Sequence, residues 1–213
     1  PALGAEQLLR LVPDVSRMCD ADAVQLFELD STDIMPEHWI RIADEIIRRY
    51  DDYDGFVIAH GTDTMAYTAS ALSYLIQNSR KPIVLTGAQK PIGFETTDSK
   101  QNLSDSFLCA ASGMAGVLVV VGGQVLLGTR ARKTRSKSFS AFSSPNYPPL
   151  ATVQNGRMAL YFDPTEGETH FCRSLDPSVG LLKLTPGTDT ELLHFMLGRY
   201  RALVIESFGV GGL

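Results

Sequence analysis

The junction at Gly55–Tyr67 constrains the fold of this chain more than any other stretch, because an apolar run ends there in small polar residues and a helical pattern follows at once. Phe56–Ala59 has the composition of a short strand buried on both faces, as in a parallel sheet. From Met65 to Ile76, apolar residues recur at helical spacing. In open parallel sheets, ligands bind beyond the carboxyl ends of the strands, where the first amides of the next helix act as donors. The polar residues His60–Thr64 are therefore predicted to line a ligand site.

The same alternation of strand and helix recurs along the chain. Pro36 begins one of the helices, which places Met35 at its N-cap. The alternation predicts an α/β fold with right-handed crossovers and a flavodoxin-like parallel sheet. Further strands are predicted at residues 22–29, 82–85 and 117–121, and helices at residues 6–12, 36–50, 64–78 and 98–112.

Turn signals organise the remainder of the chain. Gly122-Gly123 predicts a tight hairpin into residues 125–127, and Asn155-Gly156 predicts another within residues 151–162. A second, smaller α/β domain is expected to start with a strand at 180–184, a helix at 189–197 and a strand at 202–208. We predict an N-terminal α/β catalytic domain at residues 1–150, a hairpin and linker at 151–179 and a partial C-terminal α/β domain at 180–213.

Composition argues against several classes of protein. The length of 213 residues suits one large domain or slightly more, and the net charge of -5 disfavours a nucleic-acid or anionic-membrane partner. The most apolar segment, residues 113–128, is shorter than the roughly 20 residues that span a bilayer. The 3 cysteines lie far apart and the 4 histidines lack ligand spacing, so neither a disulfide framework nor a metal site is expected. These features predict a cytoplasmic protein.

Polar clusters at the ends of strands have structural alternatives to a functional role. Asp30–Asp33 and Thr86–Pro91 follow predicted strands, as the cluster after Phe56–Ala59 does. Asp63 or Thr64 could simply cap the next helix, and Asp30–Asp33 could form a turn and a cap. His60 fits a hydrogen-bonded histidine at the end of a strand better than a catalytic base.

Residues 129–149 form a long stretch without apolar periodicity. Stretches of this length in compact domains are usually functional or disordered. Its basic start could be a solvated face or a phosphate-binding patch. The basic residues are Arg130, Arg132, Lys133, Arg135 and Lys137.

The run from Gly55 to Met65, Gly-x-Val-x-x-His-Gly-Thr-Asp-Thr-Met, resembles the second signature of the asparaginase/glutaminase family of amidohydrolases. The resemblance extends over almost the whole chain and is to the type I, cytoplasmic-type L-asparaginases. The other similar segments, in order and at compatible distances, are Asp30–Asp33, Thr86–Pro91, Asp98 with Asn102, Gly128–Lys133, Ser144–Asn146 with Pro149, and Gly187.

The resemblance implies a role for each of seven residues. Thr62, Asp63 and Lys133 correspond to the second threonine, the aspartate and the lysine of the family's catalytic triad. The loop that holds the amino-acid part of the substrate corresponds to Asp30, Ser31 and Thr32, and Ala88 would place a backbone carbonyl against the leaving amide. The resemblance also implies an amino-acid substrate, neither a metal nor an organic cofactor, and assembly as a homodimer or homotetramer.

Elementary chemistry agrees with the implied triad. A threonine hydroxyl is a poor nucleophile until a base removes its proton, and a lysine amine can do so only when it is neutral. The basic neighbours of Lys133 would favour its neutral form if they point the same way. Asp63 could orient the lysine or bind the substrate's ammonium group. The amides that follow Gly61 are candidate donors to an oxyanion.

The sequence departs from the family in one respect. The first family signature, Thr-Gly-Gly-Thr-Ile, carries the threonine usually assigned as the primary nucleophile, and nothing in this sequence matches it. We therefore expect a longer natural chain, whose first strand lies upstream of Pro1 and is required for full activity.

Three functions are consistent with these observations. The first is hydrolysis of L-asparagine to L-aspartate and ammonia. The second is a non-catalytic asparagine-binding homologue, and the third is the asparaginase-like subunit of a tRNA-dependent amidotransferase, in which the basic run would contact RNA. Preference between asparagine and glutamine depends on pocket volumes that the sequence does not give.

Overall fold

The computed structural model describes residues 4–90, 92–163 and 167–209. Two compact units divide the chain, one within residues 1–173 and one within residues 174–213, and each is described by itself. Pro91, the last residue of one predicted polar cluster, lies outside the described residues.

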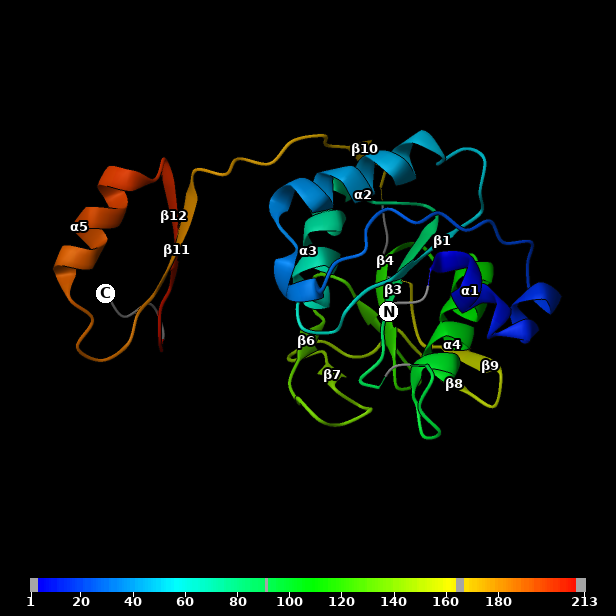
Figure 1. The fold of residues 1–213 in the computed structure, drawn as a ribbon. Helices are drawn as coiled ribbons and strands as arrows, with labels where there is room; N and C mark the ends of the chain where they lie inside the picture. Colours follow the sequence, from blue (N-terminus) through cyan, green and yellow to red (C-terminus); the bar gives the residue numbers. More distant parts are fainter. Residues whose placement is uncertain (1–3, 91, 164–166, 210–213) are drawn as a thin grey trace. The chain divides into compact units, whose positions relative to one another are not determined.

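A six-stranded sheet forms the centre of the first unit (Figure 1). Its parallel half contains three strands in the order β1-β3-β4, and antiparallel pairing continues the sheet through β5, β8 and β9. The predicted α/β fold with a parallel sheet is confirmed. The strands are β1 (Phe56–Ala59), β3 (Pro82–Thr86), β4 (Gly116–Val121), β5 (Gln124–Leu127), β8 (Ala151–Gln154) and β9 (Arg157–Leu160).

Helices occur where the apolar periodicity predicts them. Pro36 is the first residue of α2 and Met35 is its N-cap, as predicted. The helix after β1 ends three residues earlier than expected, because Ile76 and Gln77 form a short strand, β2, and Asn78 adopts a positive φ of 49°. The helices are α1 (Ala5–Arg10), η1 (Pro13–Arg17), η2 (Ser31–Asp33), α2 (Pro36–Arg48), α3 (Met65–Leu75) and α4 (Ser99–Ala111).

The helices α3 and α4 cover opposite faces of the parallel strands. A Cβ on Gly128 would lie 2.9 Å from Ser73 Oγ of α3 and 3.1 Å from Val117 Cγ1 of β4, so Val117 faces α3. Leu118, the next residue of β4, clusters with Cys109 of α4. Successive residues of a strand point to opposite faces of the sheet. The two helices that these residues contact therefore lie on opposite faces.

This placement overturns the expectation that both crossovers are right-handed. The connections β1-α3-β3 and β3-α4-β4 each advance by one strand in the same direction. Two such connections on opposite faces have opposite hands, so one of them is left-handed. The twist of β-strands disfavours left-handed connections. Because one connection is left-handed here, the loops leaving β1 and β3 diverge to opposite faces of the sheet.

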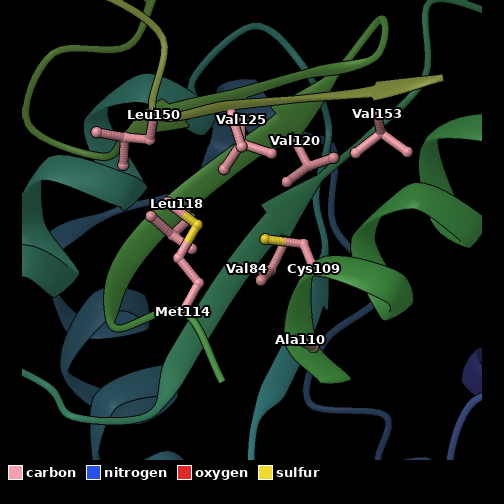
Figure 2. Close-up of a cluster of buried hydrophobic side chains, with 10 residues drawn as sticks. Val84, Cys109, Ala110, Met114, Leu118, Val120, Val125, Leu150 and Val153 are labelled. Carbon is pink, nitrogen blue, oxygen red and sulfur yellow. The ribbon is translucent and has the colours of Figure 1, made fainter. Parts of the chain in front are cut away.

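One core cluster of the first unit lies between the sheet and α4, as Figure 2 shows. Side chains from β3, β4, β5 and β8 meet the inward face of the helix there. The packing of this apolar layer fixes the helix against the strands whose ends carry the polar clusters. The buried members are Val84, Cys109, Ala110, Met114, Leu118, Val120, Val125, Leu150, Ala151 and Val153.

Both predicted hairpins form. Gly122 and Gly123 connect β4 to β5, while Asn155 and Gly156 connect β8 to β9. Asn155 has φ 52° and Gly156 has φ 68°, the left-handed pair that a two-residue hairpin with a type I′ turn requires. The second hairpin also extends the central sheet, because β8 pairs with β5.

Residues 22–29 contain no strand, contrary to the prediction. Their alternating pattern of side chains is real, but no described segment forms a ladder with them. A strand needs a hydrogen-bonded neighbour as well as a pattern, and this segment has no regular secondary structure, with Val24 and Leu29 exposed.

Residues predicted as a linker or a loop take part in two short antiparallel pairs. The strand β10 (His170–Phe171) pairs with β2, within the predicted linker. In the basic stretch, β6 (Arg132–Lys133) pairs with β7 (Phe142–Ser143).

The second unit consists of a parallel pair of strands and one helix, as the sequence predicts. These elements are β11 (Val179–Lys183), α5 (Thr190–Arg199) and β12 (Ala202–Glu206). The side chain of Asp189 caps α5 by accepting from the Glu191 amide at 2.9 Å. The predicted domain boundaries themselves remain a prediction. Among the described residues, no helix has the length and apolar character needed to cross a membrane.

Candidate active site

The exits of β1 and β3 meet at the carboxyl edge of the sheet. The His60 amide donates to Thr86 O at 2.8 Å, and a Cβ on Gly87 would lie 2.2 Å from His60 O, so only glycine allows this approach. Because the two loops then turn to opposite faces, a crevice opens between them, as at the switch points where α/β proteins bind ligands. A cavity of about 220 Å³ lies here, lined by Leu8, Ala59, His60, Thr86, Gly87, Ala88, Ser99 and Leu103.

Thr62, Asp63 and Lys133 lie together beside this edge. Lys133 Nζ donates to Thr62 Oγ1 at 2.8 Å and to Asp63 Oδ1 at 2.6 Å. Thr62 is 9% exposed, whereas the Asp63 carboxylate is largely accessible. The helix cap alternative does not describe these side chains: Thr64 is the N-cap of α3, yet its hydroxyl donates to Ser31 O at 2.6 Å and makes no capping bond.

The β6–β7 pair positions Lys133. Lys133 lies opposite Phe142, which is 3% exposed, and the amides of Thr134 and Arg135 both donate to the carbonyl of the buried residue Ala141. The apolar anchors Ala141 and Phe142 thus convert part of the predicted irregular loop into an ordered hairpin. This hairpin brings the amine to a hydroxyl 71 positions earlier in the chain.

Two of the neighbouring cations are engaged away from Lys133. The Arg130 guanidinium lies over the Tyr147 ring at 5.4 Å from its centroid, and Arg135 Nη1 donates to Ser140 O at 3.0 Å. The sequence places these charges near Lys133 along the chain, but their contacts in the fold are with other groups.

Gln89 is a site residue that the sequence reasoning missed. Its Nε2 donates to Thr62 Oγ1 at 3.1 Å, so the hydroxyl oxygen contacts both an amide and an amine. Asp98 holds the loop that carries Gln89, because its carboxylate accepts from the Gln89 and Lys90 amides. The only signal for Gln89 in the sequence is its position in the third polar cluster.

Asn102 ties the same loop to the sheet. Its Nδ2 donates to Gly87 O at 2.8 Å and its Oδ1 accepts from the Gly122 amide at 3.0 Å. Asn102 is 2% exposed and its network is satisfied, so it gives the loop a defined position. The Asp98 and Asn102 pair of the family resemblance is therefore a support for Gly87, Ala88 and Gln89.

The three residues of the predicted substrate loop make different contacts: Asp30 and Thr32 bond each other, whereas Ser31 packs against Gly61. Asp30 Oδ1 accepts from the Thr32 amide at 2.9 Å and from the Thr32 hydroxyl at 2.8 Å, so these residues pair with each other as the turn alternative anticipates. These bonds hold the pKa of Asp30 below its usual value. Ser31 is buried against Gly61, whose Cβ would lie 2.6 Å from Ser31 Oγ. Ser31 therefore adjoins the triad, whereas Asp30 and Thr32 are exposed.

Ala88 lines the crevice, and its carbonyl accepts no hydrogen bond from the residues that the structure describes. His60 has partners at both ring nitrogens, Gly61 O at 2.6 Å and Thr68 Oγ1 at 2.8 Å, in agreement with the prediction of a hydrogen-bonded histidine. Burial lowers the pKa of His60, which favours its neutral form.

The arrangement provides a hydroxyl, an amine and a carboxylate in contact, in the loop that follows the cavity residue His60. These are the functional groups of an acyl-transfer site that uses a hydroxyl nucleophile and a nearby base. Within residues 4–90, 92–163 and 167–209, no group of three or more His, Cys, Asp or Glu side chains could hold a metal ion.

Comparison with known proteins identifies the family. The profile described as "Asparaginase, N-terminal" matches residues 1–166. The chain is 38% identical over 216 residues to the L-asparaginase of Thermococcus kodakarensis. The solved structure of the thermostable L-asparaginase from that organism covers 100% of this chain with a TM-score of 0.92 at 38% identity. The chain therefore belongs to the asparaginase family, and its resemblance to the type I, cytoplasmic-type enzymes is confirmed.

Two further relatives bear on the choice of function. A glutamyl-tRNA(Gln) amidotransferase subunit of Pyrococcus horikoshii is 36% identical over 225 residues, which cover 99% of this chain. The structure of a probable cytoplasmic L-asparaginase from Campylobacter jejuni has a TM-score of 0.86 at 28% identity and covers 98% of this chain and 70% of its own. The chain spans 66% of the Thermococcus kodakarensis enzyme and 51% of the Pyrococcus horikoshii protein.

Proposed function

We propose that this protein is an amidohydrolase that converts L-asparagine to L-aspartate and ammonia through a threonine nucleophile and a Thr-Asp-Lys triad. The observation that carries the proposal is the position of Lys133 Nζ, 2.8 Å from Thr62 Oγ1 and 2.6 Å from Asp63 Oδ1. The L-asparaginase of Thermococcus kodakarensis supports the choice of reaction.

The triad activates a hydroxyl. Once the Lys133 amine has lost a proton, it accepts the proton of the Thr62 hydroxyl, while the Gln89 amide donates to the oxygen on which negative charge develops. Attack of the Thr62 oxygen on the side-chain amide breaks the carbon–nitrogen bond and releases ammonia, which takes up the transferred proton. Water then hydrolyses the acyl-enzyme, so aspartate leaves and the hydroxyl is restored.

Asp63 has two roles in this proposal. In the free protein its carboxylate holds the Lys133 amine. Because it is largely accessible, it can also accept the ammonium group of an incoming amino acid. Ser31, Asp30 and Thr32 complete the proposed amino-acid site, and the Ala88 carbonyl faces the leaving amide.

The remaining expectations belong to the same proposal. We propose a cytoplasmic protein that assembles as a homodimer or homotetramer, acts on a small amino acid without a metal or organic cofactor, and has no membrane or nucleic-acid partner. The probable cytoplasmic L-asparaginase of Campylobacter jejuni supports the location.

The proposal is tested by ammonia release from L-asparagine by the full-length protein and two variants, Thr62→Ala and Lys133→Ala. Loss of a member of a triad lowers kcat by about 10³-fold or more. Lys137→Ala, which removes an exposed cation of the same segment, serves as the matched control and should retain activity. Calorimetric binding of asparagine without turnover by the parent protein would instead support the non-catalytic homologue.

A second candidate is the asparaginase-like subunit of a tRNA-dependent amidotransferase. The Pyrococcus horikoshii amidotransferase subunit favours it, since 99% of this chain aligns with that protein. Exposed Arg132 and Lys137 are available cations for a phosphate backbone. Binding to transfer RNA that weakens steeply with salt, and weakens further in the Lys137→Ala variant, would support this candidate.

A further inference from the structure

Three hydrogen bonds lead from α2 through α3 to the backbone that precedes Thr62. Trp39 Nε1 donates to Thr68 Oγ1 at 3.0 Å, Thr68 Oγ1 lies 2.8 Å from His60 Nε2, and His60 Nδ1 lies 2.6 Å from Gly61 O. None of the bonds of this series involves Lys133 or Asp63. The series ends on the peptide group that joins Gly61 to Thr62.

The chemistry of the four groups fixes the direction of every proton in the series. A carbonyl only accepts, so His60 Nδ1 must carry the proton that Gly61 O receives. A neutral imidazole then has a bare Nε2, which accepts from the Thr68 hydroxyl. An indole only donates, so Thr68 Oγ1 accepts from Trp39 while it donates to His60. One tautomer of His60 therefore satisfies all partners at once.

Burial makes this arrangement costly to disrupt. Thr68 is 0% exposed, and a buried hydroxyl or ring nitrogen that loses its partner costs free energy. Burial also lowers the pKa of His60, which keeps the ring in the neutral form that the series requires.

The last bond acts on the active site through peptide geometry. The C=O and N–H of a trans peptide point in opposite directions, so a Gly61 carbonyl held by His60 directs the Thr62 amide to the other side. No residue in the described part of the chain accepts a hydrogen bond from that amide. The same restraint limits rotation of the backbone that carries the Thr62 hydroxyl toward Lys133.

We propose that His60, held as its Nδ1–H tautomer by Thr68 and Trp39, is a positioning residue that orients the Gly61–Thr62 peptide for the reaction. The kinetic part of this inference rests on the proposed function, whereas the tautomer and the peptide orientation do not. His60 itself need not touch the substrate, and its effect is transmitted through Gly61 to Thr62.

Nuclear magnetic resonance tests the inference without an activity assay. In the ¹⁵N spectrum of the full-length protein, His60 Nδ1 is expected to give a protonated, pyrrole-type signal and Nε2 a bare, pyridine-type signal. The Thr68→Val variant removes the hydroxyl at nearly constant shape, and it should shift the Thr62 amide signal. A proton on Nε2, or a Thr62 amide unaffected by Thr68→Val, would overturn the inference.

Kinetics test its consequence. Thr68→Val and His60→Leu are expected to lower kcat for amide hydrolysis by about tenfold to a hundredfold with a smaller change in KM, the range associated with misplacement of a reacting group. Thr68→Ser restores the hydroxyl and should recover most of the rate. The His60→Asn variant, whose side chain offers an N–H near the Nδ1 position, should have a higher kcat than the His60→Leu variant. Ser73→Ala is the control on α3, since among the described residues the Ser73 hydroxyl bonds only the Ala69 carbonyl of its own helix.

The outcomes separate this inference from the proposed function. If the parent protein shows no hydrolysis, the proposed function fails and the tautomer and the Thr62 amide still decide the inference. If the parent is active and Thr68→Val matches it in kcat, the inference fails while the proposed function stands. A variant that loses thermal stability but keeps kcat would show a purely structural role and would also overturn the inference.

Discussion

At the scale of single residues, the site depends on how closely two backbone segments approach. Gly87 and Gly61 both lie where a side chain has no room: a Cβ on Gly87 would meet His60 O, and a Cβ on Gly61 would meet Ser31 Oγ. The sequence names Thr62, Asp63 and Lys133 as candidates through a family resemblance, since the segments similar to the family place them in order. It does not identify Gln89, Thr68 or Trp39, because their contacts join positions 27, 8 and 29 residues apart that only the fold brings together.

Gly87→Ala is expected to destabilise the first unit and to reduce activity. The added methyl would lie 2.2 Å from a backbone oxygen that cannot move independently of β1, and overpacking of this kind costs about 1–3 kcal/mol. Urea unfolding followed by circular dichroism measures the effect. Gly93→Ala is the matched control, because a Cβ added there would meet no atom within 4 Å and the φ of Gly93 is not positive. Equal stability of the two variants would contradict the expectation.

Asp105→Asn is expected to stabilise the protein at neutral pH. Asp105 is 3% exposed, and desolvation by burial raises its pKa above the usual value despite a bond from Gln101. Between the unfolded and the native pKa of Asp105, the native state therefore holds a proton that the unfolded chain has lost. The contribution of the Asp105 carboxyl group to stability is present at low pH and disappears as pH rises through the native pKa. The variant accepts the same bond without a charge.

Unfolding free energies of the Asp105→Asn variant and its parent, measured between about pH 4 and pH 8, check this prediction. The two curves should approach each other at the acid end and separate toward neutrality, with the variant higher. Asp52→Asn, at an exposed position, should leave the curve of the parent unchanged. A difference in unfolding free energy that widens toward acid pH would contradict the expected direction of the pH dependence.

At the scale of elements, the sequence predicts what a local pattern can specify. The buried strands β1, β3 and β4 and the glycine turns of both hairpins follow from apolar runs and from turn residues. The strand expected at residues 22–29 fails because pairing depends on a neighbour, which a pattern does not supply. The hand of a crossover is likewise invisible to periodicity, so the left-handed connection and the crevice that it opens were not predictable from these residues.

Phe142→Ala is expected to impair catalysis by loosening the β6–β7 hairpin. Phe142 is 3% exposed and lies opposite Lys133, and truncation of a buried phenylalanine costs about 3–5 kcal/mol. Misplacement of the amine by about 1 Å can lower kcat by about a hundredfold. Ammonia release measured well below the melting temperature of the variant separates the two effects. Phe139→Ala, at a more exposed position of the same segment, should change kcat little.

At the scale of the whole molecule, two of the three cysteines, Cys109 and Cys172, report on different levels of unfolding. Cys109 is 0% exposed within the core cluster, and burial raises the pKa of its thiol to about 12. Cys172 is exposed, and its sulfur accepts only a long contact of 3.6 Å from Gln77 Nε2. Since the thiolate is the reactive form, the two side chains differ in both access and ionisation.

Labelling with a thiol reagent at pH 8 should therefore modify Cys172 rapidly and Cys109 only when the first unit unfolds. Mass spectrometry of peptides after timed labelling gives the rate at each position. Addition of denaturant should raise the Cys109 rate in parallel with the loss of circular dichroism. Rapid modification of Cys109 in native buffer would contradict the packing between α4 and the sheet.

The 71-residue interval between Thr62 and Lys133 has a consequence for biosynthesis. The ribosome synthesises the residue that carries the hydroxyl before the residue that carries the amine, and the β6–β7 hairpin that positions the amine is completed later still. If the proposed triad performs the reaction, a nascent or prematurely terminated polypeptide that ends before position 133 is expected to show no amide hydrolysis, because it lacks the lysine.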